Sequence, residues 1–84
     1  MKFNKIQKEI IQYIQGYRIN SENKIRPSIE TFCFIFKDKY SETEIRDSID
    51  ELVSSGVLNM FSFHAYLDFT KTFKSSSYNI NNWS

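Results

Sequence analysis

The side chains that most often carry chemistry are few in this chain. His64 is the only histidine and Cys33 the only cysteine. Cys33 lies at helical spacing from its aromatic neighbours Phe32 and Phe36, so we expect a small buried hydrophobe and not a nucleophile. These two residues form no zinc ligand set, and neither a glycine-rich phosphate loop nor a Ser-His-Asp spacing occurs. We therefore expect no enzyme, no metal and no cofactor.

Acidic side chains concentrate between residues 42 and 51. Five carboxylates and one arginine give this segment a formal charge of −4. Arg46 lies four residues from both Glu42 and Asp50, the spacing of ion pairs on a helix, so we favour such a pair over a guanine contact. Because DNA phosphates repel a surface of this charge, the segment suits a protein partner. The candidate contacts are Glu42, Asp47 and Asp50.

A polar stretch at residues 70–77 has the opposite character. Its lysines, Lys71 and Lys74, stand among threonines and serines that include Ser75. Such donors bind backbone phosphate without reading sequence, although a solvated loop has the same composition. Arg26 belongs to a second short basic segment. The net charge is only +1, so any attraction to DNA must come from local patches such as these.

Aromatic residues crowd the C-terminal part of the chain. A strand points alternate side chains to opposite faces, so rings on both faces of one strand cannot all reach the same core. We expect Phe61 and Phe69 to be in the core. The other rings either complete the core or form an exposed surface that stacks bases or binds a protein. These rings are Phe63, Tyr66, Phe73 and Trp83.

The elements that position these residues begin with a helix. Apolar residues three or four apart predict an amphipathic helix from about Asn4 to Gly16 or Tyr17. Gly16 has the position of a C-terminal cap, and Gln7 lies on the predicted polar side. The apolar stripe comprises Phe3, Ile6, Ile10, Tyr13, Ile14 and Tyr17.

A second, short helix is predicted by its cap. Pro27 disfavours helix at the residue before it, and Ser28 is a preferred N-cap. The helix is expected to end between Lys37 and Lys39.

The third helix is the best defined element of the sequence. Ser41 and Glu44 form the pattern of a capping box, and Gly56 has the position of a C-terminal cap. We expect the helix over residues 42–55, with an apolar face made by Ile45, Ile49, Leu52 and Val53.

A strand is predicted over residues 57–63, and its partner stays open. One interpretation pairs it with residues 66–70 through a turn at 64–65, which lacks the favoured Asn-Gly. Another pairs it with residues 78–81, leaving 70–77 as a long loop that serves as the wing. A helix over residues 65–74 also fits the spacing of its rings.

In this order of elements, the stretch from Ile6 to Phe61 resembles a winged helix-turn-helix domain, in particular the N-terminal domain of LexA-type repressors. The resemblance covers two-thirds of the chain. It implies an α+β fold, mainly α, with three helices followed by a β-hairpin wing, and duplex DNA binding with the third helix in the major groove. It rests on the stripe from Ile10 to Ile14 followed by Tyr17, the run Arg26-Pro27-Ser28-Ile29-Glu30, Ser41, and the run from Leu52 to Leu58.

The resemblance and the basic segments together give a set of candidate nucleic-acid contacts: Arg26, Ser28, Thr43, Arg46, Lys71, Lys74 and Ser75. The set of candidate protein contacts comprises Glu42, Asp47, Asp50, Phe63, Tyr66, Phe73 and Trp83. We expect a single domain over residues 1–80 with a tail at 81–84. A lone cysteine and the lack of a run of ~20 apolar residues fit a cytoplasmic protein that does not enter a membrane.

The expected function is that of a small DNA-binding regulator, or a replication or recombination accessory, of a phage, plasmid or other mobile element. Duplex and single-stranded DNA both remain open as partners, and a homodimer would supply further phosphate contacts. The alternative is a protein-interaction module, such as an accessory factor or a phage-encoded inhibitor, that uses the acidic third helix and exposed aromatics.

Overall fold

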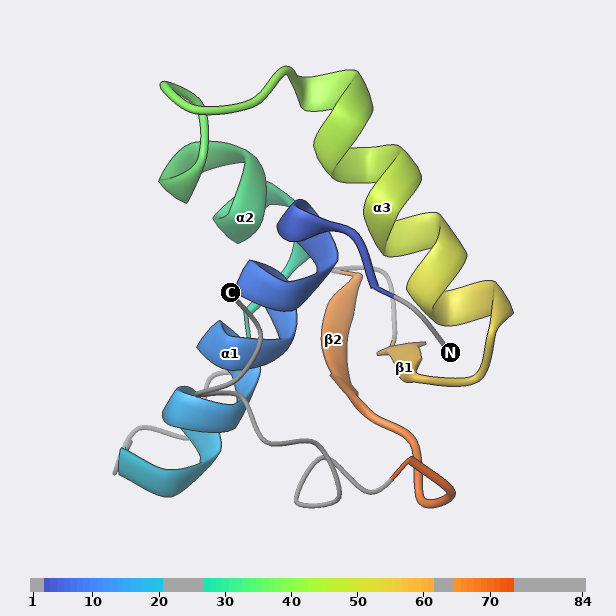
Figure 1. The fold of residues 1–84 in the computed structure, drawn as a ribbon. Coiled ribbons are helices and arrows are strands. Elements are labelled where there is room, and N and C mark those ends of the chain that lie inside the picture. The colour runs from blue at the N-terminus through green and yellow to red at the C-terminus, as the bar shows by residue number, and fades with distance from the viewer. Residues whose placement is uncertain (1–2, 21–26, 62–64, 74–84) are drawn as a thin grey trace.

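The computed structural model describes residues 3–20, 27–61 and 65–73. Within them the chain is mainly helical, with one two-stranded antiparallel sheet, which agrees with the expected α+β class. The elements follow one another as α1 (Lys5–Asn20), α2 (Ile29–Ile35), α3 (Glu42–Ser54), β1 (Leu58–Phe61) and β2 (Tyr66–Phe69), as Figure 1 shows.

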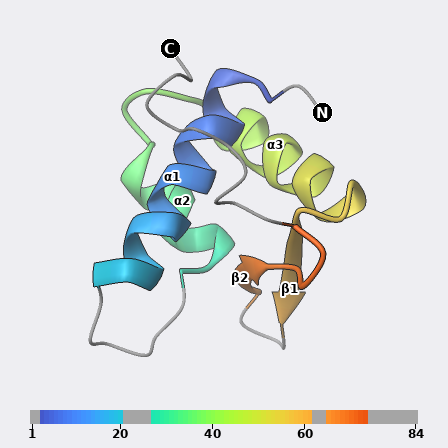
Figure 2. The same ribbon diagram turned by 60° about the horizontal axis from the view of Figure 1, so that its bottom comes forward.

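Helix α3 holds the arrangement together, because it contacts α1, α2 and β1. The connection between α2 and α3 lies at one end of the molecule and the hairpin at the other (Figures 1 and 2). The core between them contains Phe3, Ile6, Ile10, Ile11, Ile14, Phe32, Phe36, Ile45, Ile49, Leu52, Val57, Leu58 and Leu67. Burying this much apolar surface in a short chain is the main stabilising term of the fold.

Reciprocal hydrogen bonds start α1. The Asn4 carboxamide oxygen accepts from the backbone N–H of Gln7 at 2.7 Å, and the Gln7 oxygen accepts from the N–H of Asn4 at 2.9 Å. The helix continues to Asn20, so the predicted end at Gly16 or Tyr17 is wrong. Of the described glycines only Gly56 has a positive φ. Gly16 therefore does not adopt the left-handed conformation that a terminating glycine takes.

The buried stripe of α1 differs from the prediction at three positions. Ile11 is fully buried, whereas Tyr13 is exposed and its ring forms a T-shaped contact with Phe32, at 5.3 Å between centroids. Gln7 is 2% exposed and donates to the Glu51 carboxylate at 2.9 Å, contrary to its expected place on the polar side. Burial of this amide is tolerated because its polar atoms are hydrogen-bonded.

The predicted caps of α2 and α3 are confirmed. Ser28 Oγ accepts from the N–H of Thr31 at 3.3 Å, and Thr31 Oγ1 accepts from the N–H of Ser28 at 3.1 Å. In the same way Ser41 Oγ accepts from the N–H of Glu44, and a Glu44 oxygen accepts from the N–H of Ser41, both at 3.1 Å. Each helix thus begins where its capping residue predicts.

Helix α2 ends at Ile35, earlier than expected. The N–H groups of Lys39 and Tyr40 both return to the carbonyl oxygen of Phe36, at 2.9 and 3.0 Å. The hydrogen bonds of this tight turn replace the helical pattern, and the turn leads directly to Ser41.

The partner of β1 is β2, in the register Leu58 to Phe69 and Phe61 to Tyr66. The interpretation of residues 66–70 as the second strand is confirmed over Tyr66–Phe69, and a helix over 65–74 is wrong there. Residues 70–73 follow β2 and do not connect the strands, so the proposed wing at 70–77 is wrong in this part. The alternative strand at 78–81 lies outside the described residues.

The chain before α2 also joins the hairpin. The backbone N–H of Leu67 donates to the carbonyl oxygen of Pro27 at 2.8 Å, and Ser28 forms an isolated antiparallel bridge with Tyr66. The hairpin is therefore fixed to the start of α2 by backbone hydrogen bonds as well as by packing. None of the helices in the described ranges is long and apolar enough to cross a bilayer.

Candidate functional site

The two faces of the hairpin have different surroundings. Paired residues of an antiparallel sheet share a face, and the faces alternate along each strand. Leu58 and Leu67 are buried on the inner face, where Phe69 packs against the core. The outer face carries two register pairs, Asn59 with Asp68 and Phe61 with Tyr66.

Phe61 lies on the outer face and is 41% exposed, so the expectation that it belongs to the core is wrong. Leu58 points inward, and a residue three positions further along a strand must point outward. Tyr66, which was left open between core and surface, is half-buried opposite Phe61.

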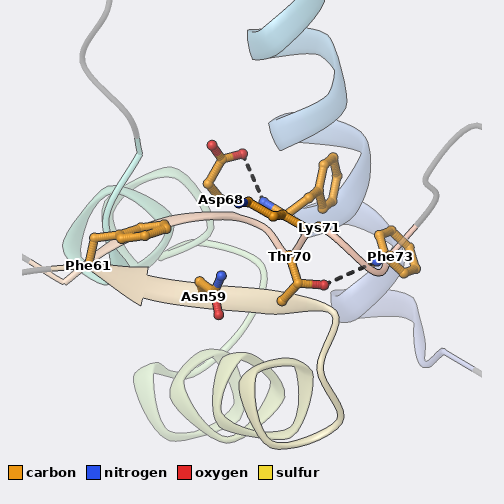
Figure 3. Close-up of a pocket in the computed structure, with 7 residues that line it drawn as sticks. Asn59, Phe61, Asp68, Thr70, Lys71 and Phe73 are labelled. Carbon is orange, nitrogen blue, oxygen red and sulfur yellow. Dashed lines mark hydrogen bonds between the residues drawn. The ribbon is translucent and has the colours of Figure 1, made fainter.

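A shallow hollow lies along this outer face and the segment after β2. Figure 3 shows Phe61 at one end and Phe73 at the other, with Asn59 and Lys71 between them. Asn59 and Lys71 are exposed. The lining residues are Asn59, Phe61, Asp68, Phe69, Thr70, Lys71 and Phe73.

Thr70 fixes the segment that bears Lys71. Its backbone N–H donates to the carbonyl oxygen of Val57 at 3.0 Å, and its hydroxyl donates to that of Gly56 at 2.6 Å. The same Oγ1 accepts from the N–H of Phe73 at 3.2 Å (Figure 3). These bonds hold residues 70–73 against the start of β1, and they place Lys71 beside the hairpin.

Phe73 joins the hairpin to α1. Its ring meets Phe3 edge to face at 6.3 Å and tilts against Phe69 at 5.3 Å, both between centroids. Of the two roles considered for Phe73, the one that completes the core is therefore closer to the observed packing, although the side chain also borders the hollow. Asp68 accepts from the N–H of Phe69 at 2.8 Å. The acid Asp68 and the base Lys71 both line the hollow.

The outer face of α3 is strongly acidic, as its sequence predicts. The five carboxylates between residues 42 and 51 are all exposed. Arg46 Nε lies 3.4 Å from a Glu42 oxygen, which confirms the predicted i,i+4 pair. Thr43, Asp47 and Asp50 are exposed along the same helix. Arg46, also a candidate for a base contact, is thus engaged by an acid of its own helix, as favoured from its spacing.

The structure places the remaining predicted contacts unevenly. The Ser28 hydroxyl caps α2, and the backbone of this residue bridges to Tyr66, so these two candidates lie together. Lys71 and Phe73 both line the hollow, whereas Thr43 and Arg46 lie on α3 and do not line it. Five candidates lie outside the described residues: Arg26, Phe63, Lys74, Ser75 and Trp83.

Sequence reasoning did not single out Asn59, Asp68 and Thr70. The alternation that places Leu58 inward would have placed Asn59 outward, but Asp68 could be added only once the strand register was known.

A second polar cluster, at the α2–α3 end, joins α1 to the turn after α2. Lys39 Nζ lies 2.6 Å from one oxygen of Glu9, and the Tyr40 hydroxyl donates to the other. Burial alone raises the pKa of Glu9, but the hydrogen bonds from Lys39 and Tyr40 outweigh it and lower the pKa overall. Donation to this carboxylate raises the pKa of Tyr40 to about 12. The cluster is fully engaged in holding the fold.

Cys33 has the surroundings of a packing residue. It is partly buried against the core, and burial raises the pKa of its thiol, so the nucleophilic thiolate is disfavoured. Within residues 3–20, 27–61 and 65–73, no group of three His, Cys, Asp or Glu side chains is placed to hold a metal ion.

Comparison with known proteins adds no relative to this description. No protein-family model matches the chain, and no curated protein or solved structure does so either.

Proposed function

We propose that the protein is a small non-enzymatic winged-helix domain that binds DNA through the outer face of its hairpin. The observation that carries the proposal is the hollow, which gathers an exposed ring, an exposed amide and an exposed lysine on one surface. The order of elements and the bridge between Ser28 and Tyr66 support a winged-helix arrangement.

Each side chain of the hollow suits one part of a nucleotide. The exposed ring of Phe61 offers a platform for a base, a contact that is tolerant of sequence. Asn59 has both a donor and an acceptor for base edges. Lys71 suits the phosphate, and the Asp68 carboxylate would accept from an exocyclic base amine.

This mode of binding differs from the one that the winged-helix resemblance implies. The exposed carboxylates of α3 repel phosphate, and Arg46 is paired with Glu42, so α3 is a poor reader of the major groove. Stacking on Phe61 requires a base that is free of its own stack, so we propose single-stranded DNA as the preferred ligand. A replication or recombination accessory of a mobile element fits this preference better than a duplex-reading repressor.

The test is a fluorescence-anisotropy titration with labelled single-stranded and duplex DNA at two salt concentrations. The Phe61→Ala variant should weaken single-strand binding by about 1–3 kcal/mol, the usual loss of one base stack. Met60→Ala is the matched control, because Met60 is 40% exposed on the opposite face of the same strand.

Lys71→Gln tests the phosphate contact in the same assay. Affinity should fall, and the slope of log K against log salt should shrink by about 0.7, as expected for one phosphate contact on a single strand. Lys37→Gln removes an equal charge at the opposite end of the molecule and should leave the slope unchanged. Absence of binding to both DNA forms at low salt would contradict the proposal.

A second candidate function, binding of a protein, is favoured by the acidic outer face of α3. Five exposed carboxylates with their one arginine already paired are complementary to a basic protein surface. If the chain binds a basic protein and not DNA, Asp47→Lys and Asp50→Lys should abolish the complex, while Phe61→Ala should leave it intact.

A further inference from the structure

The outer face of α2 carries an apolar side chain that sequence analysis did not single out. Phe34 is 71% exposed, more than any other large hydrophobic residue among the described ones. Ile35 beside it is also exposed. Single exposed rings are common in soluble proteins, so this exposure needs a second observation before it indicates a contact surface.

The second observation is the charge on either side of the ring. Glu30 lies four residues before Phe34 and is exposed, and Lys37 lies three residues after it, with Nζ 4.8 Å from the ring centroid. We call Glu30, Phe34 and Lys37 the α2 stripe. An acid and a ring lie on α2, and the base lies in the turn that follows the helix.

The charges of the stripe are not neutralised by an opposite charge, in contrast with their neighbours at this end. Lys39 is bound to Glu9 and Arg46 to Glu42, so those cations are engaged within the chain. Within the described ranges, neither Glu30 nor Lys37 belongs to an ion pair. An exposed ring between two such opposite charges can be covered by a surface of the reversed pattern.

We propose that a second copy of this chain provides that surface, through an antiparallel contact between the two α2 stripes. A two-fold axis beside Phe34 places Glu30 of each copy opposite Lys37 of the other, and stacks the two Phe34 rings between them. Such isologous contacts must be self-complementary, and an acid and a base at similar spacing on either side of a ring meet this requirement. The contact gains two ion pairs and one aromatic pair.

The size and place of the stripe set the strength of this dimer. A contact through a seven-residue helix buries less than the ~1,200 Å² typical of stable complexes. The dimer should therefore be weak and form only at high protein concentration. The net charge of +1 opposes association very little. Phe34 and Lys37 lie toward the α2–α3 connection, at the opposite end of the molecule from the connection between the strands, whereas the start of α2 is bonded to β2.

Sedimentation equilibrium of the full chain, from micromolar to near-millimolar concentration, tests the proposal. The wild type should shift from monomer to dimer over this range. Phe34→Ser should remain monomeric, whereas Met60→Ser, an equally simple loss of an exposed apolar group on the hairpin, should dimerise normally. Circular dichroism checks that both variants are folded.

Charge reversal tests the antiparallel geometry. Glu30→Lys and Lys37→Glu should each weaken self-association roughly tenfold, because each brings like charges together at both ends of the contact. The two single variants mixed together should associate, since each pair is then opposite in charge, and the double variant should recover the wild-type affinity.

These measurements leave no neutral result. A wild type that stays monomeric throughout overturns the proposal, as does a dimer that survives Phe34→Ser. Single variants that fail to associate on mixing, when the wild type dimerises, overturn the antiparallel pairing.

Discussion

The α2–α3 end and the hairpin end of the molecule are joined to α1 by different forces. At the α2–α3 end, α1 is held by charged and polar groups, with Glu9 bound to Lys39 and Tyr40. At the hairpin end it is held by rings, with Phe3 against Phe73 and Phe73 against Phe69. The first contact depends on ionisation, and the second depends on the area removed from water.

This difference extends to the surfaces that the two ends present. Near α3 the carboxylates are in excess and the one arginine is already paired. Along the hairpin an exposed ring, an amide and a lysine share one hollow, and its acid and base balance. The two ends therefore suit different partners, and a variant at one end should leave the other unaffected. Two elements link the ends: helix α3, which contacts both α2 and β1, and the start of α2, which is bonded to the hairpin.

The largest effect is expected where the two ends share a core. Leu52 is fully buried on α3, so Leu52→Ala should lower the free energy of unfolding by about 2–5 kcal/mol through lost burial and a cavity. Phe61→Ala removes a larger side chain from the exposed face of β1, and should cost only about 0.2–1 kcal/mol, the value of a cross-strand pair. Urea unfolding followed by circular dichroism measures both.

Equal losses for the two variants would contradict the assignment of Phe61 to the outer face. A change in the denaturant slope would show that a variant has altered the unfolded or native ensemble, and not stability alone.

Local signals account for most of what the sequence predicted correctly. The starts of α2 and α3 follow from Ser28 and Ser41, because a capping box involves residues only three apart. The pair between Arg46 and Glu42 lies within one helical turn and was predicted for the same reason. The left-handed conformation of Gly56 likewise belongs to the end of its own helix.

Features that depend on distant residues were not predictable in this way. Gln7 is buried because its amide meets Glu51, which is remote in sequence. The pairing of Phe61 with Tyr66 depends on the strand register, which the sequence left open because the turn lacks the favoured residues.

A smaller loss of stability is expected when the N-cap of α3 is removed, and it tests whether the two ends of the molecule are independent. Ser41→Ala removes the acceptor for the N–H of Glu44 and should lower the free energy of unfolding by about 1 kcal/mol. Ser54→Ala is the control, since Ser54 is exposed at the other end of the same helix. Hydrogen exchange should quicken at the first turn of α3 and stay unchanged in β1 and β2. Faster exchange in the hairpin would show that the two ends are coupled through α3.

The smallest effect concerns the pH dependence of the α2–α3 end. The Tyr40 hydroxyl has its pKa raised from 10 to about 12 by donation to Glu9, so the folded state retains a proton that the unfolded state loses first. Its contribution to stability is therefore complete below pH 10 and is lost as the pH rises toward 12. The lowered pKa of Glu9 acts in the other direction, with a contribution that is present above about pH 4.5 and lost on acidification.

The stability difference between the wild type and Tyr40→Phe should accordingly be constant near neutral pH and shrink as the pH rises from 10 to 12. Urea unfolding at a series of pH values measures it, with Tyr66→Phe at the hairpin end as the control. If the difference between the wild type and Tyr66→Phe follows the same course, the alkaline loss does not come from the bond to Glu9. A loss confined to Tyr40 would show that ionisation governs one attachment of α1 while the ring packing around Phe73 holds the other.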